Sequence, residues 1–207
     1  MDLQKKRKNL IKHLTAEGFL KTPKIIKAFE EVPREEFVLP SERDYAYADT
    51  PQGIGYGQTI SAPHMVAIMT ELLKPSPYDK VLEVGAGSGY QAAVLSKLVR
   101  KVYAMELIPE LAEFARANLK KAGCKNVNVI QGDGSRGYPK EAPYDKIIIT
   151  CACPEIPKPL IKQLKQEGII EAPVGGTWHQ NLIVGTKTRE HLKTKNYGGC
   201  IFVPLRH

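Results

Sequence analysis

Apolar positions follow two different patterns along this chain, and the change lies near residue 75. Before it they recur at helical spacing, which predicts three helices, over residues 3–17, 22–31 and 61–73. Gly18 ends the first helix, Thr22 and Pro23 begin the second, and Ser61 is the expected N-cap of the third. Residues 33–59 combine glycine and proline with several tyrosines, so we expect a long ordered loop there.

After residue 75, short apolar runs alternate with helical segments. Strands are predicted near 80–84, 101–105, 127–131, 144–150 and 168–172, and helices near 88–99, 109–122 and 157–165. This alternation predicts a parallel sheet with right-handed crossovers. Residues 181–186 and 200–203 are apolar with no helical segment between them, so we expect an antiparallel pair at the sheet edge.

Length and composition fit a single domain over residues 1–207, with helices and a loop in 1–75 and an α/β core in 76–207. No apolar run approaches the roughly 20 residues of a membrane span, and the basic N-terminus lacks a signal-peptide core. The four cysteines have no metal-site spacing, so we expect reduced thiols and no metal. The resulting expectation is a cytoplasmic protein that does not contact membranes.

The net charge of +8 raises the question of a nucleic-acid partner. The basic residues are dispersed, however, and their one dense run, residues 5–8, lies on the first predicted helix. A solvated helix face accounts for such a run, so we expect no nucleic-acid partner from charge alone.

The strongest chemical signal is the segment Val81–Tyr90, in which Gly85, Gly87 and Gly89 follow the first strand of the α/β region. Glycines at this turn let the backbone approach a ligand closely. Glu83 stands just before them, where a carboxylate would repel the pyrophosphate of a dinucleotide but attract the cationic amino group of S-adenosylmethionine. A nicotinamide cofactor and a purely structural turn are the alternatives.

Two more acids stand at strand ends. Glu106 ends the second strand, where an acid accepts hydrogen bonds from ribose hydroxyls. The third strand ends in Gly132-Asp133-Gly134, whose carboxylate can contact an adenine amino group. Because ligands of open parallel sheets bind at the carboxyl ends of the strands, the three acids predict one site.

Longer blocks of sequence surround these motifs. They are Val32–Phe37, Ile54–Met65, Val81–Tyr90, Gly132–Gly134, Ala142–Asp145, Pro154–Pro157, Pro173–Gly175 and Phe202–Leu205. Through them the chain resembles the protein-L-isoaspartate O-methyltransferase family over nearly its whole length. Many methyltransferases share the glycine loop, whereas the Gly-Gln-Thr-Ile-Ser-Ala-Pro-His block at 57–64 and the terminal Val-Pro-Leu are much more specific.

The resemblance implies a Rossmann-like, S-adenosylmethionine-dependent methyltransferase sheet with an N-terminal helical extension and antiparallel C-terminal edge strands. It implies methylation of the free α-carboxylate of L-isoaspartyl residues in damaged proteins, and it leaves D-aspartyl residues open as a second substrate. S-adenosyl-L-homocysteine is the by-product, and the ester collapses to a succinimide that reopens partly to normal Asp. The expected partners are isoaspartyl peptides and proteins, and the expected state is a monomer.

By the same resemblance, Ser61 is the catalytic residue. The substrate-binding residues would be Ile54, Gly55, Tyr56, Thr59 and His64. The residues that hold the methyl donor would be Gln58, Thr59, Ile60, Ser61, His64, Glu83, Gly85, Ala86, Gly87, Ser88, Glu106, Leu107, Gly132, Asp133 and Gly134. The chain departs from the family at Cys151-Ala-Cys153, which we interpret as packing, and at Arg206-His207, where many members continue.

The implied acceptor is a carboxylate, ionised at neutral pH because its pKa is about 4, so it needs no general base. Ser61, at a helix N-terminus, is expected to position it, and the glycines of 50–59 are expected to admit a substrate backbone. Two alternatives stay open. One is an S-adenosylmethionine-dependent RNA methyltransferase, suggested by the charge and by a cysteine after the fourth strand; the other is a binding module without turnover.

Overall fold

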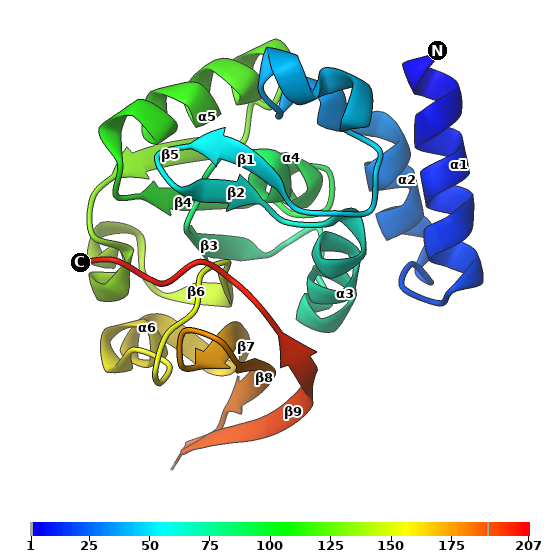
Figure 1. The fold of residues 1–207 in the computed structure, drawn as a ribbon. Coiled ribbons are helices and arrows are strands. Elements are labelled where there is room, and N and C mark those ends of the chain that lie inside the picture. The colour runs from blue at the N-terminus through cyan, green and yellow to red at the C-terminus, as the bar shows by residue number, and fades with distance from the viewer. Residues whose placement is uncertain (1, 190) are drawn as a thin grey trace.

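The computed structural model describes residues 2–189 and 191–207, and a seven-stranded sheet forms the centre of this part of the chain (Figure 1). Its strands are β3 (Lys80–Val84), β4 (Lys101–Glu106), β5 (Val127–Gln131), β6 (Tyr144–Ile149), β7 (Leu164–Gly175), β8 (Gln180–Lys187) and β9 (Leu192–Cys200). Their order is β5-β4-β3-β6-β7-β8-β9. β3 to β7 run parallel, while β8 and β9 are antiparallel, so the predicted sheet type is confirmed.

Helices cover both faces of this sheet. They are α1 (Leu3–Ala16), α2 (Pro23–Glu31), α3 (Pro63–Leu73), α4 (Tyr90–Ser96), α5 (Pro109–Lys121) and α6 (Lys158–Gln163). Buried side chains of α1 to α5 join one hydrophobic cluster, and Leu160 of α6 belongs to the cluster on the opposite face. Each predicted helix exists, although the last one ends at Gln163, because β7 begins at the next residue.

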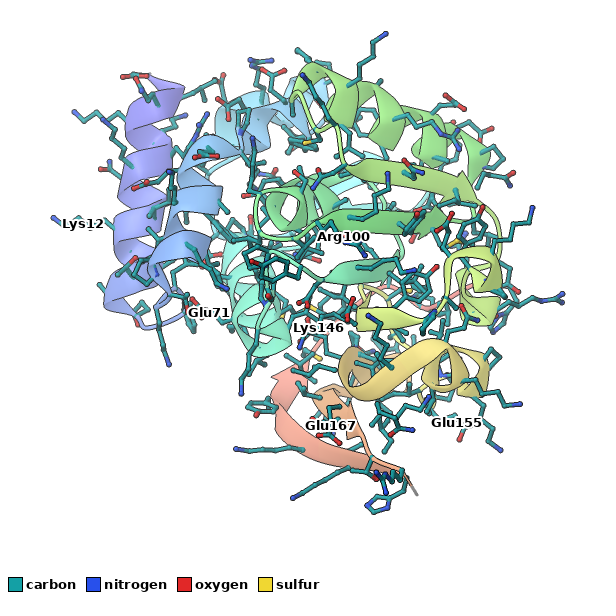
Figure 2. All side chains as sticks on the ribbon, turned by 180° about the vertical axis from the view of Figure 1, so that it is seen from behind. Lys12, Glu71, Arg100, Lys146, Glu155 and Glu167 are labelled. Carbon is teal, nitrogen blue, oxygen red and sulfur yellow. The ribbon has the colours of Figure 1, made fainter. Side chains whose placement is uncertain are left out.

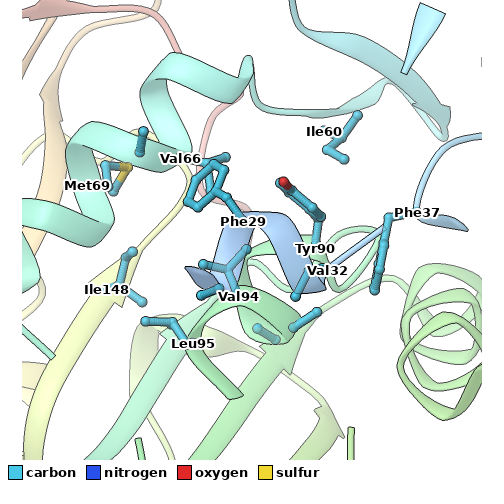
Figure 3. Close-up of a cluster of buried hydrophobic side chains, with 14 of the residues drawn as sticks. Phe29, Val32, Phe37, Ile60, Val66, Met69, Tyr90, Val94, Leu95 and Ile148 are labelled. Carbon is cyan, nitrogen blue, oxygen red and sulfur yellow. The ribbon is translucent and has the colours of Figure 1, made fainter. Parts of the chain in front are cut away.

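The central strands are apolar on both sides because both of their faces are covered. Ile147 and Ile149 of β6 point into the cluster on the α6 side, and Ile148 points into the other cluster. Figure 3 shows Phe29 of α2 and Met69 of α3 on the same side of the sheet as Ile148. The N-terminal helices therefore share one core with the glycine-loop strand and its helix.

A glutamate joins the beginning of α2 to α3. The Glu71 carboxylate, labelled in Figure 2, accepts hydrogen bonds from the backbone N–H groups of Lys21 and Thr22, both at 2.8 Å, and from the Thr22 hydroxyl at 2.6 Å. Thr22 is the N-cap residue of α2, as predicted, but its side chain makes no capping bond. The α2–α3 contact uses that hydroxyl instead.

The predicted ordered loop at 33–59 contains structure that the hydrophobic pattern did not indicate. Two 3-10 turns, Arg34–Glu36 and Pro40–Tyr45, are followed by a hairpin of β1 (Gln52–Gly55) and β2 (Gln58–Ile60). Tyr56 and Gly57 at its tip have φ angles of 55° and 70°, as a two-residue turn of left-handed backbone requires. An aromatic residue is uncommon in this conformation, so Tyr-Gly gave no hairpin signal.

The prediction of a strand at 200–203 is wrong. Residues 181–186 lie in β8 as expected, but its partner β9 ends at Cys200 and consists mostly of exposed residues such as Lys193 and Lys195. As an outer strand, β9 is held by backbone hydrogen bonds to β8 while its side chains face water. Residues 201–203 are apolar for another reason, because Phe202 is buried in the core without being in a strand.

Residues 201–207, here called the C-terminal tail, cross the carboxyl ends of the parallel strands (Figure 1). The Ala152 N–H donates to the Val203 carbonyl at 2.8 Å, and the Leu205 N–H donates to the Ala152 carbonyl at 2.7 Å. At the end of the tail, His207 Nδ1 lies 3.7 Å from Asp133 Oδ1, beyond β5. The tail thus spans from β6 to β5 along the edge where ligands of such sheets bind.

No helix in the described ranges has both the length and the apolar character needed to cross a membrane.

One buried acid lies away from that edge. Glu171 of β7 is fully buried, in register with Ile148 and Val184, and neither of its carboxyl oxygens has a hydrogen-bond partner among the described residues. Burial raises the pKa of Glu171 well above its ordinary value. The folded protein therefore keeps a proton on Glu171 that the unfolded chain releases above about pH 4.

We expect Glu171→Leu to raise the free energy of unfolding by about 1–3 kcal/mol at pH 7, because it removes a buried polar group without partners. The gain should shrink towards pH 4, where the unfolded chain also holds the proton and only the cost of burying a neutral carboxyl without partners remains. Urea denaturation at both pH values measures it. Glu155→Leu, at an exposed glutamate labelled in Figure 2, is the control and should change little; equal effects of the two variants would contradict the prediction.

Candidate functional site

Two adjoining hollows lie at the carboxyl edge of the sheet, against the glycine loop. The first, of about 560 Å³, is here called the tail hollow and is lined by Gln58, Thr59, Val84, Gly85, Gly87, Met105, Glu106, Leu107, Ile108, Gly134, Thr150, Cys151, Val203, Pro204, Leu205 and Arg206. The second, of about 420 Å³, is here called the serine hollow and is lined by Thr59, Ile60, Ser61, Val66, Met69, Glu83, Gly85, Ala86, Gly87, Ser88, Tyr90, Gln91 and Thr150. They share Thr59, Gly85, Gly87 and Thr150, so the glycine loop is a wall of both.

The glycine loop needs its glycines. Gly85 has a φ of 97°, and a Cβ there would stand 2.7 Å from the Thr150 Oγ1 atom, which in turn bonds the Gly85 carbonyl at 2.6 Å. Gly89 has a φ of 87° and begins α4, where a Cβ would press on the Ala115 carbonyl at 3.3 Å. Only glycine fits both the backbone and the space, and so the loop can pass close to a ligand.

Glu106 holds the loop in place from the end of β4. Its Oε2 atom accepts the Gly87 N–H at 2.8 Å, and its Oε1 atom accepts the Ile108 N–H at 3.0 Å. The side chain lines the tail hollow, with lone pairs left to accept hydroxyl groups of a ligand. The acid is therefore both a brace for the loop and a candidate ligand contact.

Glu83 lines the serine hollow and is fully buried. Within the part of the chain that the structure describes, neither carboxyl oxygen has a hydrogen-bond donor. Burial, and next the charge of Glu106, raises the pKa of Glu83 well above its usual range. An unpartnered buried acid costs free energy, and a cationic group of a ligand in the hollow would remove that cost.

The predicted N-cap of α3 is wrong. The cap position is Ala62, and Asp49 of the preceding loop supplies the capping oxygen from outside the helix. Its Oδ1 atom accepts the His64 N–H at 2.8 Å and lies 2.9 Å from His64 Nδ1. The Ser61 hydroxyl makes no hydrogen bond in the described ranges and is free to act in the serine hollow.

Several predicted residues lie outside both hollows. His64 packs on Phe19 with ring centroids 5.6 Å apart, and Tyr56 is exposed at the hairpin tip. Ile54 is buried beneath the hairpin against the glycine loop, 3.3 Å from where a Gly87 Cβ would lie. Gly55 and Gly132 also line neither hollow.

Asp133 is also outside the hollows and already has partners. Its Oδ1 atom accepts the Ser135 N–H at 2.9 Å and lies 2.7 Å from the Ser135 hydroxyl. Burial favours a higher pKa for Asp133, but these bonds and the charges of His207 and Arg136 outweigh it and lower the pKa. The other predicted residues, Gln58, Thr59, Ile60, Ser61, Glu83, Gly85, Ala86, Gly87, Ser88, Glu106, Leu107 and Gly134, line one hollow or both.

The sequence analysis did not predict several lining residues, among them two groups at the carboxyl edge of the sheet, and it also left out Val66, Met69, Val84, Tyr90, Gln91, Met105 and Ile108. Thr150 and Cys151 follow β6, where a strand end of the sheet should have drawn attention to them. Val203, Pro204 and Leu205 belong to the terminal block that marked the family resemblance, and that was the available signal. Arg206 also lines the tail hollow.

The cysteines after β6 are unsuited to act as nucleophiles. Burial raises the pKa of the Cys151 thiol, and it raises the pKa of Cys153 to about 11. Both thiols are protonated at neutral pH, which speaks against covalent attack on a pyrimidine ring and agrees with their interpretation as packing residues.

Comparisons with known proteins point in one direction. The sequence profile of the family described as Protein-L-isoaspartate(D-aspartate) O-methyltransferase (PCMT) matches residues 5–207. A relative from Archaeoglobus fulgidus named Protein-L-isoaspartate O-methyltransferase 2 is 54% identical over 209 residues, covering 100% of this chain and 95% of the relative.

Two solved structures share the fold. One, described as protein-L-isoaspartate O-methyltransferase, has a TM-score of 0.87 at 29% identity, covering 97% of this chain and 66% of that chain. The other, from Plasmodium falciparum and in complex with S-adenosyl-L-homocysteine, has a TM-score of 0.85 at 24% identity, covering 97% and 98% of the two chains.

We expect stability and chemistry to separate at the start of α3. Asp49→Ala should lower the free energy of unfolding by about 0.5–2 kcal/mol, because α3 loses its cap, and Asp49→Asn should lose less, because it keeps an acceptor oxygen. Ser61→Ala should stay within about 0.5 kcal/mol of the wild type. Thermal unfolding measures the stability of all three variants. If Ser61→Ala lowers the free energy of unfolding as much as Asp49→Ala does, Ser61 is the residue that caps α3.

Proposed function

The chain belongs to the protein-L-isoaspartate(D-aspartate) O-methyltransferase family, and we propose from this membership and from the two hollows that it methylates the free α-carboxylate of L-isoaspartyl residues in damaged proteins. The ester then collapses to a succinimide, which reopens partly to normal aspartate. The observation that carries the proposal is the serine hollow. There the Ser61 hydroxyl, which does not cap α3, and the unpartnered Glu83 carboxyl line the same space. One group can hold the acceptor and the other the donor.

The donor is S-adenosyl-L-methionine, which when bound supplies an electrophilic sulfonium methyl group and leaves as S-adenosyl-L-homocysteine. Glu83 would hold its cationic amino group, since this carboxylate has no other partner among the described residues. Glu106 would accept hydrogen bonds from the ribose, and the tail hollow would take the adenosine part. The fit rests on buried oxygens that lack donors and on a glycine loop that leaves room for a ligand.

On the acceptor side, the protein supplies alignment rather than proton transfer. The substrate carboxylate is already ionised, so the Ser61 hydroxyl needs only to orient it, and holding two reactants in place can lower a barrier by roughly 7–11 kcal/mol. Val66 and Met69 are buried, apolar residues of the same hollow, and they limit the water that can solvate the carboxylate. Because opposite charges are destroyed in the reaction, a drier site favours it.

The predicted residues outside the hollows keep proposed roles of a different kind. Ile54, Gly55 and Tyr56 belong to a hairpin whose backbone can meet the substrate backbone, and this would distinguish isoaspartate from aspartate without reading flanking side chains. His64 acts through Asp49 on the start of α3. Gly132 and Asp133 would reach an adenine amino group once Asp133 exchanges one of its present partners.

We also propose that the chain works as one domain and as a monomer, in the cytoplasm, on protein rather than nucleic acid. The dispersed basic charge and the protonated buried thiols Cys151 and Cys153 support the choice of substrate over the RNA alternative. The intact serine hollow supports turnover over a binding module.

We expect Glu83→Gln to weaken the binding of S-adenosyl-L-homocysteine roughly 10- to 100-fold, the range for loss of a charge-assisted hydrogen bond. In the wild type, affinity should rise with pH above the ordinary carboxyl range, because the bound amino group requires the ionised form of a carboxyl whose pKa is raised. The variant should lose this dependence. Titration calorimetry measures both, with Glu171→Gln as a matched control at a buried acid outside the hollows; an equal loss in the control would refute the role of Glu83.

The proposed activity is tested with a tritiated methyl donor and two peptides that differ only in an isoaspartyl or a normal aspartyl residue. We expect incorporation into the isoaspartyl peptide alone, and at least tenfold slower turnover by Ser61→Ala with an unchanged melting temperature. Incorporation into the aspartyl peptide alone, or into neither, would overturn the assignment. Full turnover by Ser61→Ala would remove Ser61 from the chemistry while leaving the activity in place.

A further inference from the structure

A fully buried arginine lies directly behind the serine hollow. Arg34, on the first 3-10 turn, is 0% exposed. Its Nη2 atom donates to the carbonyl of Ser61 at 2.9 Å, and its Nε atom donates to the carbonyl of Ala46 at 2.8 Å. Its guanidinium carbon lies 4.9 Å from the ring centroid of Tyr90. One side chain thus connects the loop before β1, the start of α3 and the helix of the glycine loop.

The charge of Arg34 is not neutralised by an ion pair in residues 2–189 and 191–207. Its Nη1 atom is buried and has no acceptor within those residues either. Burial lowers the pKa of Arg34 to about 10, while Tyr90, Asp49 and Tyr47 oppose this shift, so the guanidinium stays charged at neutral pH. A buried cation with an idle donor is costly, so a purely structural role explains it poorly.

Two residues that Arg34 contacts also line the serine hollow, and they indicate where its charge acts. Ser61 and Tyr90 line the serine hollow, so the guanidinium stands one residue behind the wall that would face the acceptor. Figure 3 shows Tyr90 with its hydroxyl end on the side of Ile60, the residue before Ser61. The buried Phe37 ring packs on the same Tyr90 ring, with centroids 5.6 Å apart, and Arg34 itself is fully buried, so the field of the charge is weakly screened there.

We propose that Arg34 is a positioning residue for Ser61 and that its charge holds the acceptor carboxylate in the serine hollow. The inference rests on the proposed function, since it needs an anionic acceptor at Ser61. In this reaction the carboxylate loses its charge as it attacks the sulfonium methyl group. A nearby cation therefore stabilises the bound carboxylate more than the transition state, and it lowers KM for the peptide rather than raising kcat.

Two substitutions separate the charge from the clamp. Arg34→Met removes the charge at similar length, and we expect KM for the isoaspartyl peptide to rise about tenfold or more, while KM for S-adenosylmethionine changes less than threefold. Arg34→Lys keeps the charge, but one ammonium group cannot reproduce the guanidinium fork on two carbonyls. We expect it to keep KM for the peptide within about threefold and to lose at least fivefold in kcat.

Arg7→Met is the matched control. Arg7 is another N-terminal arginine in a hydrogen-bonded network, 3.0 Å from Glu35 and 2.7 Å from the Tyr47 hydroxyl, and none of these residues lines the serine hollow or the tail hollow. It should lower the melting temperature and leave both KM values unchanged.

Steady-state kinetics with the isoaspartyl peptide, run below the lowest melting temperature of the set, distinguishes the outcomes. A rise in peptide KM confined to Arg34→Met supports the charge, and an equal rise in Arg34→Lys overturns it. If Arg34→Met does not fold, Arg34→Lys decides alone, because an unchanged kcat would overturn the positioning role and a raised KM would overturn the charge. If the wild type has no activity on the peptide, both the proposed function and this inference are overturned. If the wild type is active and the Arg34 variants keep its kcat and its KM for the peptide, only the inference is overturned.

Discussion

Two buried ionisable groups of opposite kind flank the serine hollow, an acid and a base, and neither has an ion-pair partner among the described residues. Glu83 lines the hollow without a donor, and Arg34 lies behind Ser61 with one donor idle. A core built for stability alone would avoid both, because burying charge costs free energy. The proposed reaction brings together a cationic donor and an anionic acceptor, so each protein charge meets a ligand charge of the opposite sign. The bound reactants thus supply the partners that Glu83 and Arg34 lack in the free protein.

The walls around these charges come from distant parts of the chain, and the sheet is what gathers them. Parallel strands place Glu83, Glu106 and Thr150 at one edge, because every strand of the set ends there. The hairpin β1–β2, from the N-terminal part of the chain, and the C-terminal tail both line the tail hollow at this edge. The tail is held by backbone bonds to Ala152 and by the burial of Phe202 in the core.

The sequence predicts this architecture well where a residue pattern has one structural solution. Glycines at alternate positions after an apolar strand allow only a tight turn, and the strand–helix alternation allows only a parallel sheet, so the loop at Gly85 and its acids were predictable. Ser61 was misread as a cap because Asp49, twelve residues earlier in the chain, delivers the capping oxygen by folding over the helix start. No local pattern contains such a contact.

Other misses have equally specific physical reasons. β9 is polar because water covers its side chains, so no hydrophobic alternation marks it. The hairpin tip uses Tyr56 in a left-handed conformation that sequence rules reserve for glycine and asparagine. Arg34 resembles any surface arginine until the fold buries it, because its burial depends on Ala46, Ser61 and Tyr90 arriving from three different segments.

The exposed lysines of β9 affect which other chains can pair with the edge of the sheet. An outer strand offers unpaired backbone groups to any extended chain, and damaged proteins with unfolded segments are rich in such chains. Lys193 and Lys195 put repelling charge along that border of the sheet, against a second copy of it above all. These charges therefore oppose edge-to-edge pairing of β9 between two copies of the enzyme, and they oppose its co-aggregation with the damaged proteins that it methylates.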